Sequence, residues 1–247
     1  MSKNVKGKCA LCGETKKLTF EHIPPQKFYN DETVYIYHGD AFLKKNAKSH
    51  QEQRGFGLYS LCDSCNNLTG GWYNNAFLDF ANNIDKITPQ ILTTADNYIN
   101  CNNVYPNQVI KQILSWFCSV NNDDSRIDDL RKFVLDKNAV GINQERFRLL
   151  IAFTDIEYIM CHGFGKIVNI FDAGIETETF SEVVFPPFDF RLIINPNINE
   201  EYWGDITMFS DYKYEESINP WIPIKVKHEN DYPNLALKDC DVGGKKG

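Results

Sequence analysis

The residues best suited to metal chemistry are cysteines, which form two Cys-x-x-Cys pairs, Cys9 with Cys12 and Cys62 with Cys65. Each pair places two thiols on one tight turn, and four thiolates are a ligand set that tetrahedral zinc favours. Zinc binding could stabilise a small module by on the order of 10 kcal/mol. A redox function would account for one such pair but not for two. The sequence therefore predicts one structural zinc ion shared by all four cysteines, with a segment inserted between the pairs.

A glutamate and a histidine lie between these pairs, at the end of the run Leu18–Phe20. An unperturbed imidazole titrates near neutral pH, so His22 could accept a proton in a reaction. Pro24 and Pro25 cannot continue a hydrogen-bonded strand, which predicts that the chain turns away and leaves His22 at an open strand end. The plainer alternatives remain open: a hydrogen-bonding histidine, an exposed Glu21 carboxylate, and a simple turn or cap function for Asn66, directly after Cys65.

Taken together, the Cys-x-x-Cys pairs, the strand ending in Glu-His-x-Pro and the Cys-Asn step resemble the HNH (ββα-metal) endonucleases. The likeness covers residues 9–85 and is greatest for the zinc-containing branch that includes the phage endonuclease VII. It implies that His22 is the general base and that Glu21 and Asn66 hold a divalent metal, Mg²⁺ or Mn²⁺. The implied reaction is hydrolysis of DNA phosphodiester bonds.

The chain departs from that family pattern at three places. Glu21 stands where many members have aspartate, and Thr69-Gly70 replaces a Lys-Gly pair. Gly57 occupies the place of the middle asparagine, which ties down the loop under the catalytic histidine. This last departure supports an alternative function, a zinc-stabilised module that binds nucleic acid or protein without catalysis. A redox or metal-handling protein is a third and weaker alternative.

The net charge of −7 is unevenly distributed. Residues 1–60 contain ten Lys/Arg and six Asp/Glu, whereas residues 91–247 contain 15 and 24. A basic end on an acidic body indicates that a polyanion such as DNA would meet the N-terminal part. A solvated basic loop is the alternative reading. The candidate phosphate contacts are Lys27, Lys44, Lys45, Lys48 and Arg54.

Hydrophobic periodicity predicts an α+β protein in two parts. Residues 1–88 would form the zinc-stapled ββα-metal module, with a helix over 72–87 that begins after the interruption at Gly70-Gly71. Residues 89–247 would form a second domain of unknown role, with helices at 107–120 and 124–136 and a mainly antiparallel sheet. Its strands are expected at 146–155, 158–171, 177–185, 188–195, 206–212 and 221–227.

The N-terminus lacks the apolar run of a signal peptide, and no apolar stretch is long enough to cross a bilayer. We therefore expect a cytoplasmic protein without membrane contact, and the family resemblance suggests a bacterial or phage origin. In such a reducing compartment, paired cysteines more often bind metal than form disulfides. Besides DNA, the expected partners are a second copy of the chain or another subunit, bound through the C-terminal domain.

Overall fold

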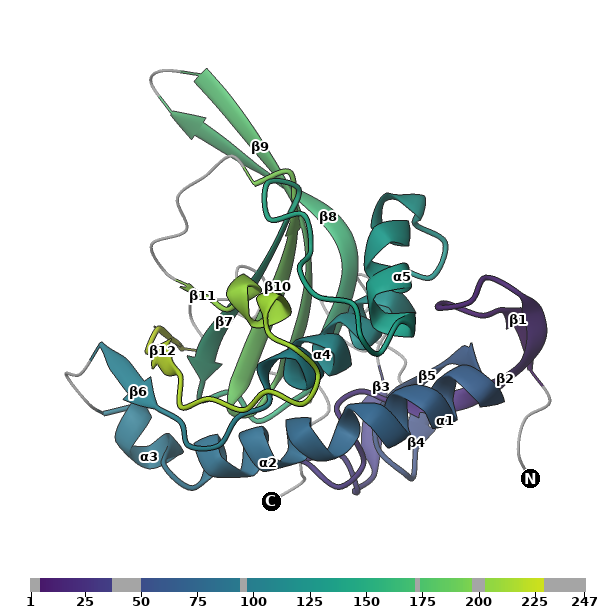
Figure 1. The fold of residues 1–247 in the computed structure, drawn as a ribbon, viewed down its shortest axis with the longest axis horizontal. Coiled ribbons are helices and arrows are strands. Elements are labelled where there is room, and N and C mark those ends of the chain that lie inside the picture. The colour runs from purple at the N-terminus through teal and green to yellow at the C-terminus, as the bar shows by residue number, and fades with distance from the viewer. Residues whose placement is uncertain (1–4, 37–49, 94–96, 172–173, 197–202, 229–247) are drawn as a thin grey trace.

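The computed structural model describes residues 5–36, 50–93, 97–171, 174–196 and 203–228 (Figure 1). A small sheet and a long sheet lie at different ends of the molecule, with helices between them (Figure 1). The expectation of a mixed protein with helices and antiparallel sheets is confirmed. The division into domains at residue 88 stays a prediction.

The N-terminal sheet contains β1 (Lys6–Lys8), β2 (Thr15–His22) and β5 (Gly57–Cys62), all antiparallel, in the order β1-β2-β5. The strand expected at Leu18–His22 is therefore present and begins earlier. A short hairpin of β3 (Val34–Ile36) and β4 (His50–Glu52) is inserted between β2 and β5. Helix α1 (Asp63–Trp72) follows β5 directly, so that strand, strand and helix are consecutive parts of one unit, β2–β5–α1.

The helix expected over 72–87 is present with bounds two residues shorter at each end, but the interruption expected at Gly70-Gly71 was wrong. Helix α1 runs through Gly70 and Gly71 to Trp72, and α2 (Asn74–Asp85) begins after a bend at Tyr73. The buried Tyr73 hydroxyl donates a 2.7 Å hydrogen bond to the carbonyl of Val134, which fixes the chain at this bend. The two glycines lie on the solvent side of α1, where a helix tolerates them at a modest cost.

The helices expected at 107–120 and 124–136 are confirmed as α4 (Pro106–Val120) and α5 (Asp128–Leu135). Proline at the first position of α4 suits a helix start because its missing N–H has no helical partner there. A 3-10 turn, η2 (Ser125–Ile127), precedes α5. The remaining short elements are α3 (Thr88–Ile91) and β6 (Tyr98–Asn100).

The long sheet has the order β11-β7-β10-β9-β8, with β13 (Val226–Lys227) parallel to β7. Four expected strands are confirmed, because the alternating β-branched and aromatic residues of this region form consecutive antiparallel pairs. The strands of the main path are β7 (Phe147–Thr154), β8 (Met160–Phe171), β9 (Gly174–Phe185), β10 (Phe188–Ile194) and β11 (Gly204–Asp205).

One further strand prediction was wrong, and another is confirmed only in part. The segment 206–212 is a 3-10 helix, η3 (Thr207–Asp211), because the Asp205 carboxylate accepts the backbone N–H of Thr207 and starts a turn there. The segment 221–227 is divided between β13 and β12 (Trp221–Pro223), which pairs with β6. Pro223 ends β12 because it has no N–H for a ladder.

An aromatic core joins the N-terminal unit to the long sheet. Phe28, from the loop after β2, has its ring centroid 6.4 Å from that of Phe77 on α2 and 6.1 Å from that of Phe188 on β10. Trp116 of α4 packs edge-on against Phe77 at 4.7 Å. These side chains are almost fully buried, and burial of each contributes about 2–3 kcal/mol. The loop that follows His22 is thus held to the body of the protein.

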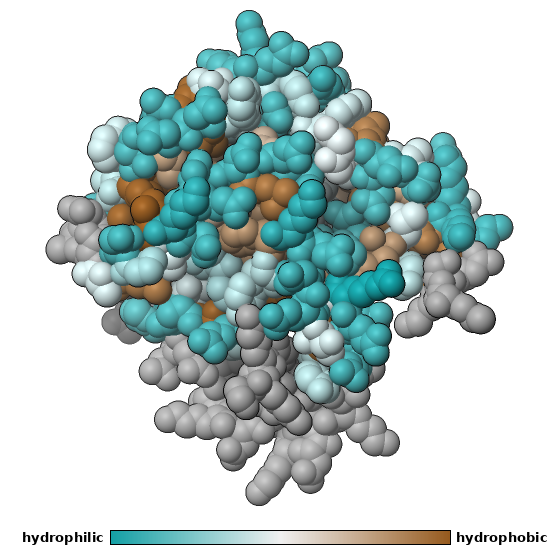
Figure 2. Space-filling view, turned by 90° about the horizontal axis from the view of Figure 1, so that it is seen from below, coloured by the Kyte–Doolittle hydropathy of each residue, from teal (hydrophilic) through white to brown (hydrophobic). Residues whose placement is uncertain are grey.

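The side of the molecule below α1 and α2 is mainly hydrophilic, with small separate apolar areas (Figure 2). Within the described ranges, no helix is both long and apolar enough to span a membrane.

Candidate zinc centre and candidate active site

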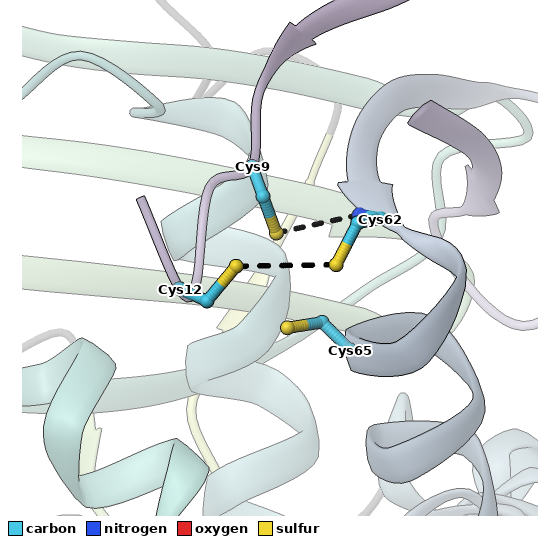
Figure 3. A group of neighbouring side chains, drawn as sticks. All are labelled: Cys9, Cys12, Cys62 and Cys65. Atoms are coloured by element: carbon cyan, nitrogen blue, oxygen red, sulfur yellow. Dashed lines mark hydrogen bonds between the residues drawn. The ribbon is translucent and has the colours of Figure 1, made fainter. Parts of the chain in front are cut away.

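Four cysteine sulfurs converge where the turn between β1 and β2 meets the start of α1 (Figure 3). The Sγ atoms of Cys9, Cys12, Cys62 and Cys65 lie within 4.8 Å of one another, and those of Cys12 and Cys62 are 3.9 Å apart. Tetrahedral Zn–S bonds of about 2.3 Å imply Sγ–Sγ separations of roughly 3.8 Å. A disulfide would require about 2.05 Å, so the thiols are free. The prediction that both pairs meet is confirmed, and the cluster could hold a metal such as zinc.

Hydrogen bonds at the cluster favour a thiolate at Cys9. The backbone N–H of Cys62 donates to the Cys9 Sγ at 3.3 Å, and the Ser64 hydroxyl lies 3.2 Å from the Cys62 Sγ. The pKa of Cys9 is lowered to about 4, first by the hydrogen bond from the Cys65 thiol and then by backbone N–H groups. By contrast, the hydrogen bond to Cys9 raises the pKa of Cys65, and burial raises the pKa of Cys12. A metal binds the deprotonated form, so metal binding would release the protons of these two thiols.

The cysteine turn is anchored to α5 by Arg131, which the sequence patterns did not single out. Its guanidinium is almost fully buried and donates to the carbonyl of Ala10 at 2.7 Å. It also donates to the carbonyls of Asn121 and Asn122 at 2.9 and 2.8 Å. The N-terminal metal cluster therefore has a fixed position relative to the helices.

His22 is the last residue of β2, and its ring is held from the side of Arg54. The Nε2 atom lies 2.9 Å from the Arg54 carbonyl oxygen, and the ring packs edge-on against Phe20. A carbonyl can only accept, so Nε2 carries the proton and Nδ1 keeps its lone pair. Partial burial of the ring lowers the pKa of His22, and the nearby Arg54 charge lowers it further. The hydrogen bond to the Arg54 carbonyl raises the pKa but does not outweigh these two effects. The imidazole is therefore neutral at pH 7 and can accept a proton at Nδ1.

Glu21 is a buried carboxylate, contrary to the solvent-exposed alternative. Only 7% of the residue is exposed, and burial raises the pKa of its carboxyl to about 8. Within the part of the chain that the structure describes, no hydrogen bond or ion pair reaches this carboxylate. Buried carboxylates are costly unless they are paired or bind a metal. Glu21 is thus a buried carboxyl rather than a surface group.

Asn66 lies on the first turns of α1, against β2. Its Nδ2 donates a 3.0 Å hydrogen bond to the Thr19 hydroxyl, which itself donates to the Leu61 carbonyl at 3.0 Å. Because the Thr19 proton is used, Thr19 can only accept from Asn66. The amide nitrogen therefore faces the strand and the Oδ1 atom is left available.

Glu21 and His22 project from opposite faces of β2, and Asn66 contacts β2 from helix α1. Side chains alternate along a strand, so Glu21 shares a face with Thr19, the partner of Asn66. His22 shares the other face with Phe20. No hydrogen bond joins Glu21, His22 and Asn66 to one another among these described residues. A substrate group could reach both faces only across the end of β2.

Position 57, where the resemblance would have an asparagine, is a glycine, and a different asparagine, Asn30, bridges the loops near His22. A side chain at Gly57 would collide with the Glu21 carbonyl and the Phe20 ring, so only glycine fits there. Asn30 is 1% exposed, and its Nδ2 donates to the carbonyls of Pro24 and Phe56 at 2.6 and 2.8 Å. Its Oδ1 accepts the Phe56 N–H at 2.6 Å. It therefore joins the two loops that flank His22.

Two of the five candidate phosphate contacts can be located. Lys27 lies in the loop after β2 and Arg54 lies just before β5, and both are exposed. Arg54 is close enough for its charge to act on His22. Lys44, Lys45 and Lys48 lie outside the described residues.

Comparison of the chain with protein-family models, with curated proteins and with solved structures found no match. The functional argument therefore depends on the geometry of the residues themselves. That geometry comprises a four-thiolate cluster, a neutral histidine held at a strand end, and two oxygen donors on the neighbouring face.

Proposed function

We propose that the chain is a metal-dependent endonuclease of the HNH type, which hydrolyses phosphodiester bonds in DNA. The observation that carries the proposal is the position of His22 at the end of β2, with Nε2 bound to the Arg54 carbonyl and no hydrogen bond at Nδ1 among the described residues. In the proposal, His22 is the general base of the unit β2–β5–α1, which also contains the buried Glu21 carboxyl and the oriented Asn66 amide. A zinc module that only binds a partner needs none of these features.

In the proposed reaction, His22 takes a proton from the attacking water at Nδ1. The Arg54 carbonyl holds the ring in the tautomer that leaves Nδ1 unprotonated, so no rearrangement is needed before the proton moves. As the ring becomes cationic, the same hydrogen bond becomes charge-assisted and stronger. A positioned base of this kind contributes roughly 10²–10⁴-fold to a rate.

The residues on the other face of β2 fit a hard divalent cation such as Mg²⁺ or Mn²⁺. Glu21 offers a carboxylate that has no partner among the residues the structure describes, and Asn66 offers an oriented amide oxygen. Both are oxygen donors, and one or two protein ligands with several waters are typical for Mg²⁺. When bound there, the cation would neutralise charge on the phosphate and on the leaving 3′ oxygen. The scissile phosphate would lie across the end of β2, between the two faces.

The structure also bears on the main argument for the alternative, a binding module that has lost catalysis. That argument was the glycine at position 57, which left the histidine loop without its asparagine. Asn30 supplies the same kind of bridge from the other loop, so the departure does not require loss of function.

Plasmid cleavage in the presence of Mg²⁺ or Mn²⁺ tests the proposal. His22→Ala should slow cleavage by roughly 10²–10⁴-fold while zinc content and DNA binding stay as in the wild type. Gln26→Ala, at an exposed position in the same loop, is the matched control and should cleave like the wild type. If His22→Ala cleaves as fast as the wild type at the same pH and metal concentration, the active-site assignment is wrong and the binding-module alternative replaces it.

A further inference from the structure

The hairpin of β1 and β2 places two lysines directly opposite each other. Lys6 pairs with Lys17 in the antiparallel register. The bonds from Leu18 N to Val5 O and from Cys9 N to Glu14 O mark the hydrogen-bonded residue pairs of this ladder. Because such pairs alternate, Lys6 and Lys17 form a non-hydrogen-bonded pair, in which facing side chains are closest.

Lys8 lies on the same face, two residues beyond Lys6, and we call Lys6, Lys8 and Lys17 the lysine face. All three are exposed, and none forms an ion pair with another described residue. By contrast, Lys16 lies on the other face and pairs with Glu14 at 2.5 Å. Like charges directly opposite each other destabilise a sheet. Within the described ranges, no acidic side chain offsets this cost.

The lysine face lies on the same side of β2 as Glu21. Lys17, Thr19 and Glu21 alternate along β2, but helix α1 covers this side at Thr19, which binds Asn66, and Glu21 is buried. Four residues separate Lys17 from Glu21, a distance of about 13 Å along a strand. One strand of duplex DNA advances about 3.4 Å per phosphate along the helix axis, so this distance matches about four phosphates.

We propose that the lysine face binds the phosphate backbone of a nucleic-acid strand, several phosphates away from the scissile phosphate at the end of β2. This inference rests on the proposed nuclease function for the position of the scissile phosphate. The observation that Lys6 and Lys17 face each other depends only on the strand register and not on that function. Contact with the phosphates of a polyanion would offset the repulsion between these three neighbouring ammonium groups and would use them for binding.

The test is a binding titration with a fluorescent 20-base-pair duplex and the matching single strand, at several salt concentrations. The protein is the full chain carrying His22→Ala, with Mg²⁺ present. Adding Lys6→Gln, Lys8→Gln and Lys17→Gln should reduce the slope of log K against log salt by roughly 2–3, at about 0.9 per lost duplex contact. At 0.1 M salt, this corresponds to roughly a hundredfold weaker binding. The result expected for single strands is a smaller change in slope, about 0.7 per contact.

A control with the same change in net charge carries Lys86→Gln, Lys166→Gln and Lys213→Gln, three exposed lysines away from the hairpin. It should bind with the parent's slope. Equal slopes for the parent and the lysine-face variant would overturn the inference. The same variants are also titrated with anionic phospholipid vesicles. If the lysine-face variant loses vesicle binding while its nucleic-acid binding is unchanged, the inference is likewise overturned.

Thermal melting excludes a merely structural function for these lysines. Without nucleic acid and at low salt, the lysine-face variant should melt at the same temperature or about 1–3 °C higher, because repulsion is removed. Melting several degrees lower would overturn the inference. The two proposals fail separately. Wild-type protein that binds through the lysine face but never cleaves refutes only the nuclease. His22-dependent cleavage with an unchanged salt slope refutes only the lysine face.

Discussion

The side-chain amide of Asn66 donates a hydrogen bond to the hydroxyl of Thr19, and this bond decides which end of the amide faces outward. Thr19 gives its own proton to the carbonyl of Leu61, so it must accept from Asn66. The contact links the helix that carries Cys65, directly after Cys62 at the end of β5, to the strand that ends in Glu21 and His22. The cysteine cluster and the proposed catalytic residues are therefore held within the same unit, β2–β5–α1.

Replacement of Asn66 should affect the metal requirement rather than the base. Asn66→Ala removes one proposed ligand oxygen, so the Mg²⁺ concentration for half-maximal cleavage should rise by roughly 10–100-fold. The measurement is cleavage rate against Mg²⁺ concentration. Asn67→Ala, at the exposed neighbouring position on α1, should leave that concentration unchanged. If the curves of rate against Mg²⁺ concentration coincide for the two variants, Asn66 is not a ligand.

The raised pKa of the Glu21 carboxyl predicts that the free energy of unfolding depends on pH. Burial raises the pKa of its carboxyl from 4.5 in the unfolded chain to about 8 in the folded protein. Between these pH values, the folded state binds more protons than the unfolded state, so wild-type stability should fall as pH rises from 4.5 to 8. Glu21→Gln removes this dependence, and above pH 8 the variant should be more stable than the wild type by a few kcal/mol.

Urea unfolding at pH 5 and pH 8.5, without divalent cations other than the zinc, measures this difference. Added Mg²⁺ should then restore the stability of the wild type at pH 8.5 and have little effect on Glu21→Gln, because the cation stabilises the charged carboxylate. A wild type and a variant that respond equally to pH and to Mg²⁺ would show that Glu21 is not a ligand.

The four-thiolate cluster predicts a zinc-dependent fold. Purified protein should contain about one zinc ion per chain, and Cys62→Ala should lose it and unfold the N-terminal unit. Cys101→Ala is the matched control, because Cys101 is similarly buried, at 3% exposure against 2%, but lies outside the cluster. Metal analysis and circular dichroism before and after chelation give the answer. Metal-free protein with an unchanged melting curve would contradict the prediction.

Sequence patterns predicted correctly those features that depend on residues close together in the chain. Cys-x-x-Cys spacing identified the four ligands, and apolar periodicity located α4, β7 and β10, because these elements bury a regular face. The glycines of α1 misled the helix boundary, since two exposed glycines interrupt a pattern without ending a helix. The segment 206–212 also has strand-like residues, but the Asp205 side chain competes for its backbone N–H.

The residues that were missed act through long-range contacts. Arg131 reaches a carbonyl on the cysteine turn more than a hundred positions away, and Thr19 orients Asn66 across 47 positions. Asn30 had no motif around it, and its function depends on a loop 26 positions later. A single sequence does not encode such partners in its spacing. They become visible only when the chain is folded.

Asn30 carries the last prediction, because it joins the loop after β2 to the segment that contains the Arg54 carbonyl. Asn30→Ala would leave two carbonyls and the Phe56 N–H without their partner, at a cost of about 2–4 kcal/mol. We also expect cleavage to fall more than the unfolded fraction explains, because the Arg54 carbonyl loses its fixed position against His22. Zinc content should stay at the wild-type value, since the cysteines lie at the other end of β2.

The measurement is the cleavage rate per folded molecule, at a temperature well below the melting point of the variant. Asn82→Ala, an exposed substitution of the same type on α2, should change neither rate nor stability. If Asn30→Ala is destabilised but its folded fraction cleaves at the wild-type rate, the bridge supports the fold alone. The His22 ring would then be held in place by the strand end and the Phe20 contact without help from the second loop.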